Sequence, residues 1–133
     1  MTEEQARHDV IQYWLGQARD ALASARAELA AGRRHFAVNR VYYACFYSAS
    51  AVLLKQGRTY VKHGALRAAV HRELVKTGRL DAQWGRFYDF AFSRRGQADY
   101  AELVAFDEPQ VAEMTQKAGV FVGEMERIVA QAS

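Results

Sequence analysis

The stretch AVNRVYYACFYSASAVLLKQG, residues 37–57, decides the fold of this chain. Its apolar side chains recur at the three- and four-residue intervals that place residues on one side of an α-helix. This face comprises Val38, Tyr42, Cys45, Phe46, Ala49, Val52 and Leu53. Gly32 before the stretch and Gly57 at its end are natural boundaries, because glycine adopts the left-handed conformation in which helices commonly end. The sequence therefore predicts a long helix with one apolar face.

A second apolar stripe precedes this stretch and has the same spacing. It comprises Ile11, Trp14, Leu15, Ala18, Leu22, Ala25 and Leu29. Two long amphipathic helices joined by a short connection pack side by side in opposite directions. We therefore expect an antiparallel hairpin of helices to form the first half of the protein.

Three further helices are predicted after residue 57. One begins near Lys62 and ends at the KTGR motif, where Gly78 can take the left-handed conformation. The next begins near Leu80 and is expected to fray at or near Gly96, because glycine is unfavourable inside helices. The last follows FDEPQ, in which Asp107 can cap the first turn. No run shows the alternation of a half-buried strand, so the fold class is all-α, an antiparallel four- or five-helix bundle.

The composition indicates one domain over residues 1–133. Half of the residues are hydrophobic, which is enough for one core in a chain of this length. The single cysteine, Cys45, lies among apolar residues and is expected to be buried. No export signal is visible, and the longest uncharged run has only 14 residues, whereas a membrane span needs about 20. These features predict a cytoplasmic protein without a membrane segment.

The charge balance permits a nucleic-acid ligand without requiring one. The chain has 18 basic and 15 acidic residues, a formal net charge of +3. Basic residues gather in several short segments, which is also typical of solvated helix faces and helix ends. The function therefore has to be sought in particular motifs.

Two segments together resemble the HEPN-domain family. The tyrosine-rich stretch 37–57 is similar to its second helix, and RRGQADY, residues 94–100, is similar to the turn of a subgroup that carries an R-x-x-A-D-Y pattern. The resemblance covers most of the chain. It implies a helical bundle that usually forms a homodimer and is often encoded beside a small nucleotidyltransferase in toxin–antitoxin or defence systems. Many members are metal-independent ribonucleases with a histidine a few positions after an arginine.

The chain departs from that pattern at the histidine. All four histidines precede Arg94, at His8, His35, His63 and His71. Cleavage through the 2′-hydroxyl needs a group that takes a proton near neutral pH, and arginine supplies only positive charge. A tyrosine is a poor base at its ordinary pKa. The sequence therefore argues against an ordinary ribonuclease, and the remaining catalytic candidates are Arg95, Asp99 and Tyr100.

The expected ligand-binding residues are Arg94, Arg95, Arg40 and Tyr43. Arginine holds phosphate oxygens in a bidentate manner, and Arg40 and Tyr43 lie within one helical turn, so they can face the same groove. The alternative is structural. The two arginines of the turn would then be helix-end charges, one of them salt-bridged to Asp99 or Asp89. Asp99 would lock the turn by accepting hydrogen bonds from an arginine or from free amides, and Tyr100 would pack on the bundle. A further alternative, implied by the resemblance, is that Tyr100 accepts AMP from a nucleotidyltransferase.

Three functions remain open at this point. The first is a homodimeric HEPN-like protein that binds RNA, a nucleotide or a nucleotidyltransferase partner and has no ordinary ribonuclease activity. The second is a metal-independent endoribonuclease toxin that uses Arg95 with Asp99 or Tyr100. The third is a structural helical adaptor without a ligand. None of the three calls for a cofactor or a metal ion, because the chain has no phosphate-binding glycine loop or HExxH motif.

Overall fold

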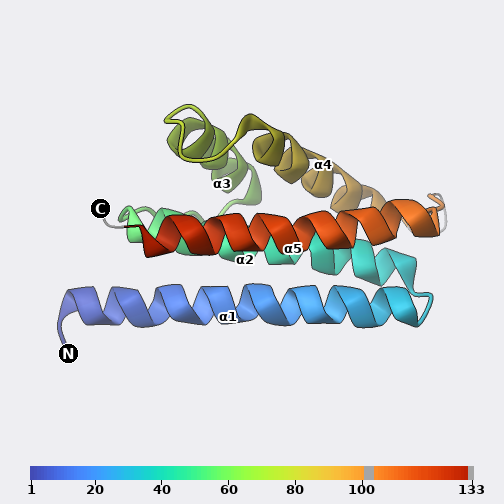
Figure 1. Cartoon of the computed structure of the whole chain (residues 1–133), viewed down its shortest axis with the longest axis horizontal. Coiled ribbons are helices and arrows are strands. Elements are labelled where there is room, and N and C mark those ends of the chain that lie inside the picture. The colour runs from blue at the N-terminus through green and yellow to red at the C-terminus, as the bar shows by residue number, and fades with distance from the viewer. Residues whose placement is uncertain (101–103, 132–133) are drawn as a thin grey trace.

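The computed structural model describes residues 1–100 and 104–131, and it confirms the all-α fold class. The helices are α1 (Glu3–Ala30), α2 (Arg34–Lys55), α3 (His63–Ala69), α4 (Ala82–Ala98) and α5 (Glu108–Ala130) (Figure 1). A π-helical segment, η1 (Val70–Val75), continues α3. The described residues contain no strand.

Helix α2 lies at the centre of the bundle. It forms the predicted antiparallel hairpin with α1, and α5 lies along the same pair, while α4 crosses above them (Figure 1). The side chains of α2 that face its neighbours are fully or almost fully buried, among them Val38, Val41, Tyr42, Cys45 and Leu53. The burial of Cys45 was expected from its apolar neighbours.

Three glycines end helices as the sequence predicts. Gly32, Gly57 and Gly78 follow α1, α2 and η1, and their φ angles are 78°, 79° and 78°. An L-residue rarely adopts this left-handed conformation, whereas glycine has no Cβ that would clash with the backbone. The short connections from Gly32 and Gly57 send the chain back along the preceding helix.

The helix starts and one helix end differ in detail from the prediction. Asp107 is the residue before α5, but its side chain makes no capping hydrogen bond, and Pro109 occupies the first turn as expected. Helix α4 runs to Ala98, two residues past Gly96, so it ends near this glycine as predicted. Ala98 is 8% exposed and belongs to the core, and this packing outweighs the intrinsic cost of glycine in the last turn.

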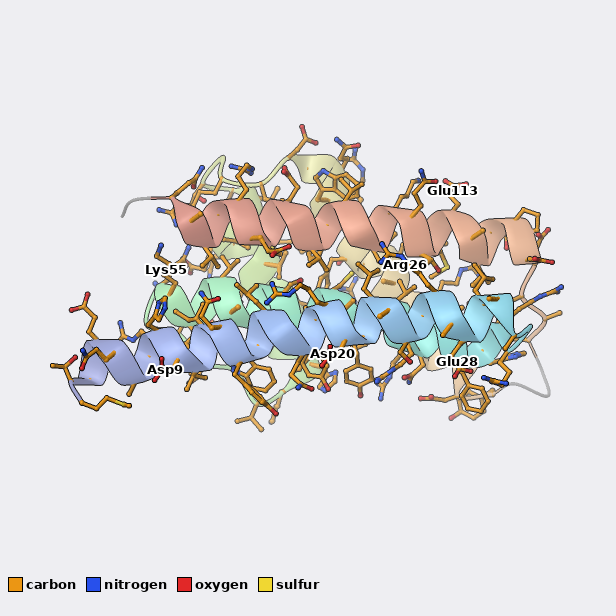
Figure 2. The ribbon with its side chains drawn as sticks, turned by 60° about the horizontal axis from the view of Figure 1, so that its bottom comes forward. Asp9, Asp20, Arg26, Glu28, Lys55 and Glu113 are labelled. Atoms are coloured by element: carbon orange, nitrogen blue, oxygen red, sulfur yellow. The ribbon has the colours of Figure 1, made fainter. Side chains whose placement is uncertain are left out.

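The ends of α2 and α5 are tied together by one lysine. Lys55 Nζ donates hydrogen bonds to the carbonyl oxygens of Val129 and Gln131, the latter at 2.9 Å. Figure 2 shows Lys55 between the two helices. The ammonium group also interacts favourably with the negative, C-terminal end of the α5 dipole. None of the helices in the described part of the chain is long and apolar enough to span a membrane.

Candidate functional site

Arg95 lies on the side of α4 that faces α2. Its Nη2 donates a hydrogen bond of 3.2 Å to the hydroxyl of Tyr43. Its guanidinium carbon is 5.6 Å from the ring centre of Tyr43 and 5.7 Å from that of Tyr42. The Nε atom is buried and has no hydrogen-bond partner among the described residues. Arg95 is therefore held against two tyrosine rings rather than extended into solvent.

Arg40 approaches the same tyrosine. Its guanidinium carbon lies 5.1 Å from the ring centre of Tyr43, and its Nε donates to Asn39 Oδ1 at 3.3 Å. The structure thus brings together three of the four predicted ligand-binding residues, one from α4 and two from α2. Two guanidinium groups share one phenol ring, which concentrates positive charge beside an aromatic surface.

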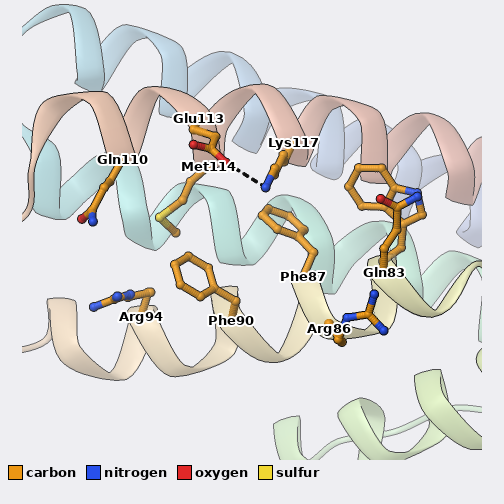
Figure 3. A pocket seen from close by; sticks show the side chains of 10 residues that line it. Gln83, Arg86, Phe87, Phe90, Arg94, Gln110, Glu113, Met114 and Lys117 are labelled. Atoms are coloured by element: carbon orange, nitrogen blue, oxygen red, sulfur yellow. Dashed lines mark ion pairs between the residues drawn. The ribbon is translucent and has the colours of Figure 1, made fainter.

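Arg94 does not join this group. Its guanidinium carbon lies 4.9 Å above the ring of Phe90, and its Nη1 donates to Gln97 Oε1 at 2.8 Å. Consecutive residues of an α-helix point about 100° apart, so Arg94 and Arg95 cannot serve the same site on α4. Arg94 instead lines a groove between α4 and α5 (Figure 3).

The packing expected for Tyr100 is wrong, and the turn that Asp99 is expected to lock continues into residues outside the described part of the chain. Tyr100 is 65% exposed and does not pack on the bundle, and Asp99 is exposed. Within residues 1–100 and 104–131, neither Arg94 nor Arg95 forms an ion pair with a carboxylate. Asp89 pairs with Arg67 (2.7 Å) and His71 (2.9 Å) instead.

A histidine that the sequence analysis set aside lies next to Arg95. His63 is the first residue of α3, and its Nδ1 is 2.8 Å from the hydroxyl of Tyr42. Its ring stacks on Phe46 with a centroid distance of 4.4 Å and lies 6.0 Å from the ring of Tyr43. The prediction that no histidine can act beside Arg95 is therefore wrong at His63. The connection after Gly57 folds α3 back onto α2 and brings His63 to Tyr42.

The protonation states of His63 and Tyr42 follow from burial and from the charge of Arg95. Burial first, and the positive charge of Arg95 second, lower the pKa of His63 below its ordinary value of 6.5. Burial raises the pKa of Tyr42 to about 12. At neutral pH the group therefore contains a neutral imidazole and a neutral phenol beside charged guanidinium groups.

We call Arg40, Tyr42, Tyr43, His63 and Arg95 the Arg95–His63 cluster. Its two guanidinium groups can hold an anion, and the neutral imidazole can take up a proton. In the tautomer that donates Nδ1–H to Tyr42, Nε2 is the proton-accepting nitrogen, and Nε2 has no hydrogen-bond partner in the described part of the chain. No set of three residues that could hold a metal ion occurs among residues 1–100 and 104–131.

Comparison with known proteins gives concordant results. A family model described as "HEPN domain" matches residues 11–128. A protein of Thermotoga maritima named "UPF0332 protein" is 42% identical over 123 residues, which are 92% of this chain and 93% of that protein.

Two proteins of Methanocaldococcus jannaschii named "Putative toxin" are more distant. One is 27% identical over 67% of this chain and 60% of its own length, and the other is 28% identical over 68% and 67%. The family match spans almost all of the helical bundle and all three helices that contribute to the Arg95–His63 cluster. The chain belongs to the HEPN domain family.

Proposed function

We propose that the protein is a toxin-type HEPN protein that binds the phosphate groups of RNA at the Arg95–His63 cluster. The observation that carries this proposal is the pair of guanidinium groups on Tyr43, neither of which is ion-paired with a carboxylate within residues 1–100 and 104–131. Seven of the fourteen arginines form ion pairs. Arg40 and Arg95 are among those that form none within the described residues, and both contact the ring of Tyr43. An arginine with free donors near an aromatic ring suits phosphate and nucleic-acid ligands.

Two further facts support the proposal. Two relatives carry the name "Putative toxin", and the chain has a net positive charge. Positive charge raises the local concentration of a polyanion and the rate of its association. The resemblance to the paired HEPN systems agrees with a role in which RNA or a nucleotidyltransferase is the partner.

The test is a binding titration with a fluorescently labelled single-stranded RNA of twelve nucleotides, followed by anisotropy. Arg95→Ala should weaken binding roughly tenfold or more, because a charge-assisted hydrogen bond to phosphate is lost. Arg19→Ala is the matched control, since Arg19 is an exposed arginine paired with Glu126. An equal loss in both variants would show that binding is nonspecific. Absence of saturable binding to the wild type would leave the adaptor hypothesis in place.

A second function, metal-independent cleavage of RNA, is favoured by the position of His63. In this reaction Nε2 of His63 takes the proton of a 2′-hydroxyl, and the 2′-oxygen attacks the adjacent phosphorus. The bond from phosphorus to the 5′-oxygen breaks, and that oxygen takes a proton from water. The products are a 2′,3′-cyclic phosphate and a 5′-hydroxyl end. Arg95 would balance the charge that grows on the phosphate oxygens.

This second function is tested with a labelled RNA in the presence of EDTA. His63→Gln should abolish cleavage and leave RNA binding within about twofold of the wild type, because Arg95 still holds the phosphate. His8→Gln is the control, since His8 is exposed near the start of α1. Asp99→Asn and Tyr100→Phe, which alter the earlier catalytic candidates, should cleave normally. If cleavage survives His63→Gln but is lost in Asp99→Asn or Tyr100→Phe, the proton acceptor lies in the turn of Asp99 and Tyr100 and not at His63.

We also propose that the protein forms a homodimer through the outer face of α2. Phe36 is 62% exposed there, and Tyr47 on the same face is only half-buried. Light scattering after gel filtration should give twice the mass of the chain, and Phe36→Glu should give the mass of the monomer. A monomeric wild type would contradict the proposal. Co-purification with a nucleotidyltransferase encoded beside the chain would test the other partner.

A further inference from the structure

Two rows of side chains face each other where α3 and η1 lie beside α4. Residues three or four positions apart lie on the same side of a helix, so each row follows one helix. The row on α3 and η1 comprises His63, Arg67 and His71, and the row on α4 comprises Asp89, Phe92 and Arg95. Figure 1 shows α3 and α4 on the same side of α2. We call this contact the α3–α4 seam, and the Arg95–His63 cluster lies at one end of it.

Arg67 is held in a fixed orientation in the middle of the seam. Its Nε donates a hydrogen bond of 2.7 Å to Asp89 Oδ1, and its guanidinium carbon lies 4.8 Å from the ring centre of Phe92. His71 Nε2 is 2.9 Å from the same carboxylate oxygen. Burial acts to raise the pKa of Asp89, but the hydrogen bonds with His71 and Arg67 outweigh it and lower the pKa. The carboxylate is therefore charged at neutral pH and orients the guanidinium group.

The outer edge of this guanidinium group remains open to a ligand. Asp89 accepts only from Nε, and the two Nη atoms of Arg67 have no acceptor within residues 1–100 and 104–131. The side chain is 41% exposed. Arg72 differs, because its Nε and Nη2 already donate to Glu73 and to the hydroxyl of Tyr60. The paired Nη groups of Arg67 can thus bind two oxygens of one phosphate, in spite of the ion pair on the other side.

Aromatic rings connect Arg67 with the Arg95–His63 cluster. The ring centre of Phe92 is 5.9 Å from that of Tyr42, and the guanidinium carbon of Arg95 is 5.7 Å from the same Tyr42 ring. Along α3, Arg67 follows His63 by one helical turn, which is about 6 Å. Successive phosphates of a single strand are a similar distance apart. A strand whose phosphate binds Arg95 can therefore place a neighbouring phosphate at Arg67.

We propose that Arg67 binds the phosphate next to the one at Arg95, so that the RNA strand runs along the α3–α4 seam. Proteins that bind single strands commonly combine a row of positive charges with aromatic side chains in this way. The inference rests on the proposed function and names a second phosphate contact for it. Asp89 is then a positioning residue, since it orients Arg67 and does not itself touch the RNA.

The test is the salt dependence of binding to a 2′-O-methyl RNA of twelve nucleotides, which cannot be cleaved through its blocked 2′-oxygen. Each phosphate neutralised on a single strand contributes about 0.7 to the slope of log K against log salt concentration. Arg67→Ala should reduce this slope by about 0.7 and weaken binding roughly three- to tenfold. Arg67→Lys should keep the slope, because the positive charge remains.

Asp89→Asn is the matched control, because it breaks the same ion pair. If Arg67 served only as the partner of Asp89, the two variants would weaken RNA binding equally. As a phosphate contact, Arg67 should still act in Asp89→Asn, so that variant should keep the wild-type slope and bind no more weakly. Arg72→Ala removes an exposed arginine whose donors are engaged, and it should change neither quantity.

Short ligands show where the second phosphate lies. The 2′-O-methyl dinucleotide UpA has one phosphate, and a terminal phosphate is added at its 5′ or its 3′ end. One of the two additions should tighten binding to the wild type and have no such effect in Arg67→Ala.

Three outcomes would overturn the proposal. These are an unchanged slope in Arg67→Ala, equal losses of affinity in Arg67→Ala and Asp89→Asn, and no gain in affinity from either terminal phosphate. A slope that falls in Arg95→Ala but not in Arg67→Ala would leave the proposed RNA site intact and remove only the second contact. A wild type that does not bind RNA would contradict both proposals.

Discussion

His63 and Arg95 come from different helices, yet Arg95 affects the protonation of His63. Burial disfavours the charged imidazolium, and the positive charge of the guanidinium acts in the same direction. Arg95 therefore has a role in the cluster even before a ligand arrives. Together with burial, it favours the neutral form of the imidazole that can accept a proton.

The first prediction concerns this coupling. Arg95→Gln should raise the pKa of His63, because the removed charge no longer opposes the imidazolium. The measurement is an NMR titration of the histidine Cε1–H signals, with His63→Gln to assign the resonance. Arg94→Gln is the control, since Arg94 lies over Phe90 on another side of α4. An unchanged pKa in Arg95→Gln would show that burial alone lowers it.

A second prediction follows for stability. The pKa of His63 is lower in the folded protein than its ordinary value of 6.5, so the unfolded chain binds more protons between the two values. The contribution of His63 to stability is thus complete above pH 6.5 and is lost as the pH falls through the folded pKa. Urea denaturation from pH 5 to pH 8 should show this loss in the wild type and a flatter profile in His63→Gln.

The sequence predicted three of the five residues of the cluster, for a definable reason. Arg40 and Tyr43 share a helical turn, and Arg95 stands in a recognisable motif, so local spacing was enough. His63 is not near them in sequence, and its place depends on the turn after Gly57 and on the packing of α3. Such long-range contacts leave no spacing signal in a single sequence. Arg94 was predicted to join the cluster because it is adjacent to Arg95 in sequence. The two side chains point to different sides of α4, so this prediction was wrong.

Among the elements, α4 depends on a close approach to η1 at Gly85. A Cβ atom at this position would lie 2.8 Å from Val75 Cγ2 and 3.0 Å from His71 Cε1. Both distances are too short for carbon atoms in contact. The π-helical turn of η1 was not predicted from the sequence, because its extra residue per turn has no signature in the apolar pattern.

The prediction at this scale is that Gly85→Ala destabilises the protein. Overpacking costs about 1–3 kcal/mol, which exceeds the 0.5–1 kcal/mol or so that alanine contributes inside a helix. The expected net loss is about 1–2 kcal/mol in the free energy of unfolding, measured in urea. Gly123→Ala in α5 has no atom within 4 Å of the added Cβ, so it should stabilise slightly. The changes in the free energy of unfolding should have opposite signs in the two variants. Equal signs would contradict the close approach at Gly85.

For the whole molecule, the central place of α2 predicts a single cooperative unit. Leu53 is fully buried and the adjacent Leu54 is half-buried. Leu53→Ala should cost about 2–5 kcal/mol and Leu54→Ala clearly less, because only the first leaves a cavity in the core.

The fluorescence of the two tryptophans provides the measurement. Trp14 reports on α1 and Trp84 on α4, and Trp14→Phe and Trp84→Phe variants separate their signals. The two urea transitions should coincide if residues 1–133 form one domain. Two separate transitions would show that the α1–α2 hairpin and the later helices unfold independently.

Tyr42 has two roles, since its ring is fully buried in the bundle while its hydroxyl binds His63. A substitution at Tyr42 would change both the stability of the bundle and the chemistry of the cluster, so this position should change slowly in evolution. Gly96 and Gln97 in the last turn of α4 have no such second role, because both are exposed. New ligand preferences would therefore arise more readily at residues 96–97 than at Tyr42, where each substitution also disturbs the packing of the bundle.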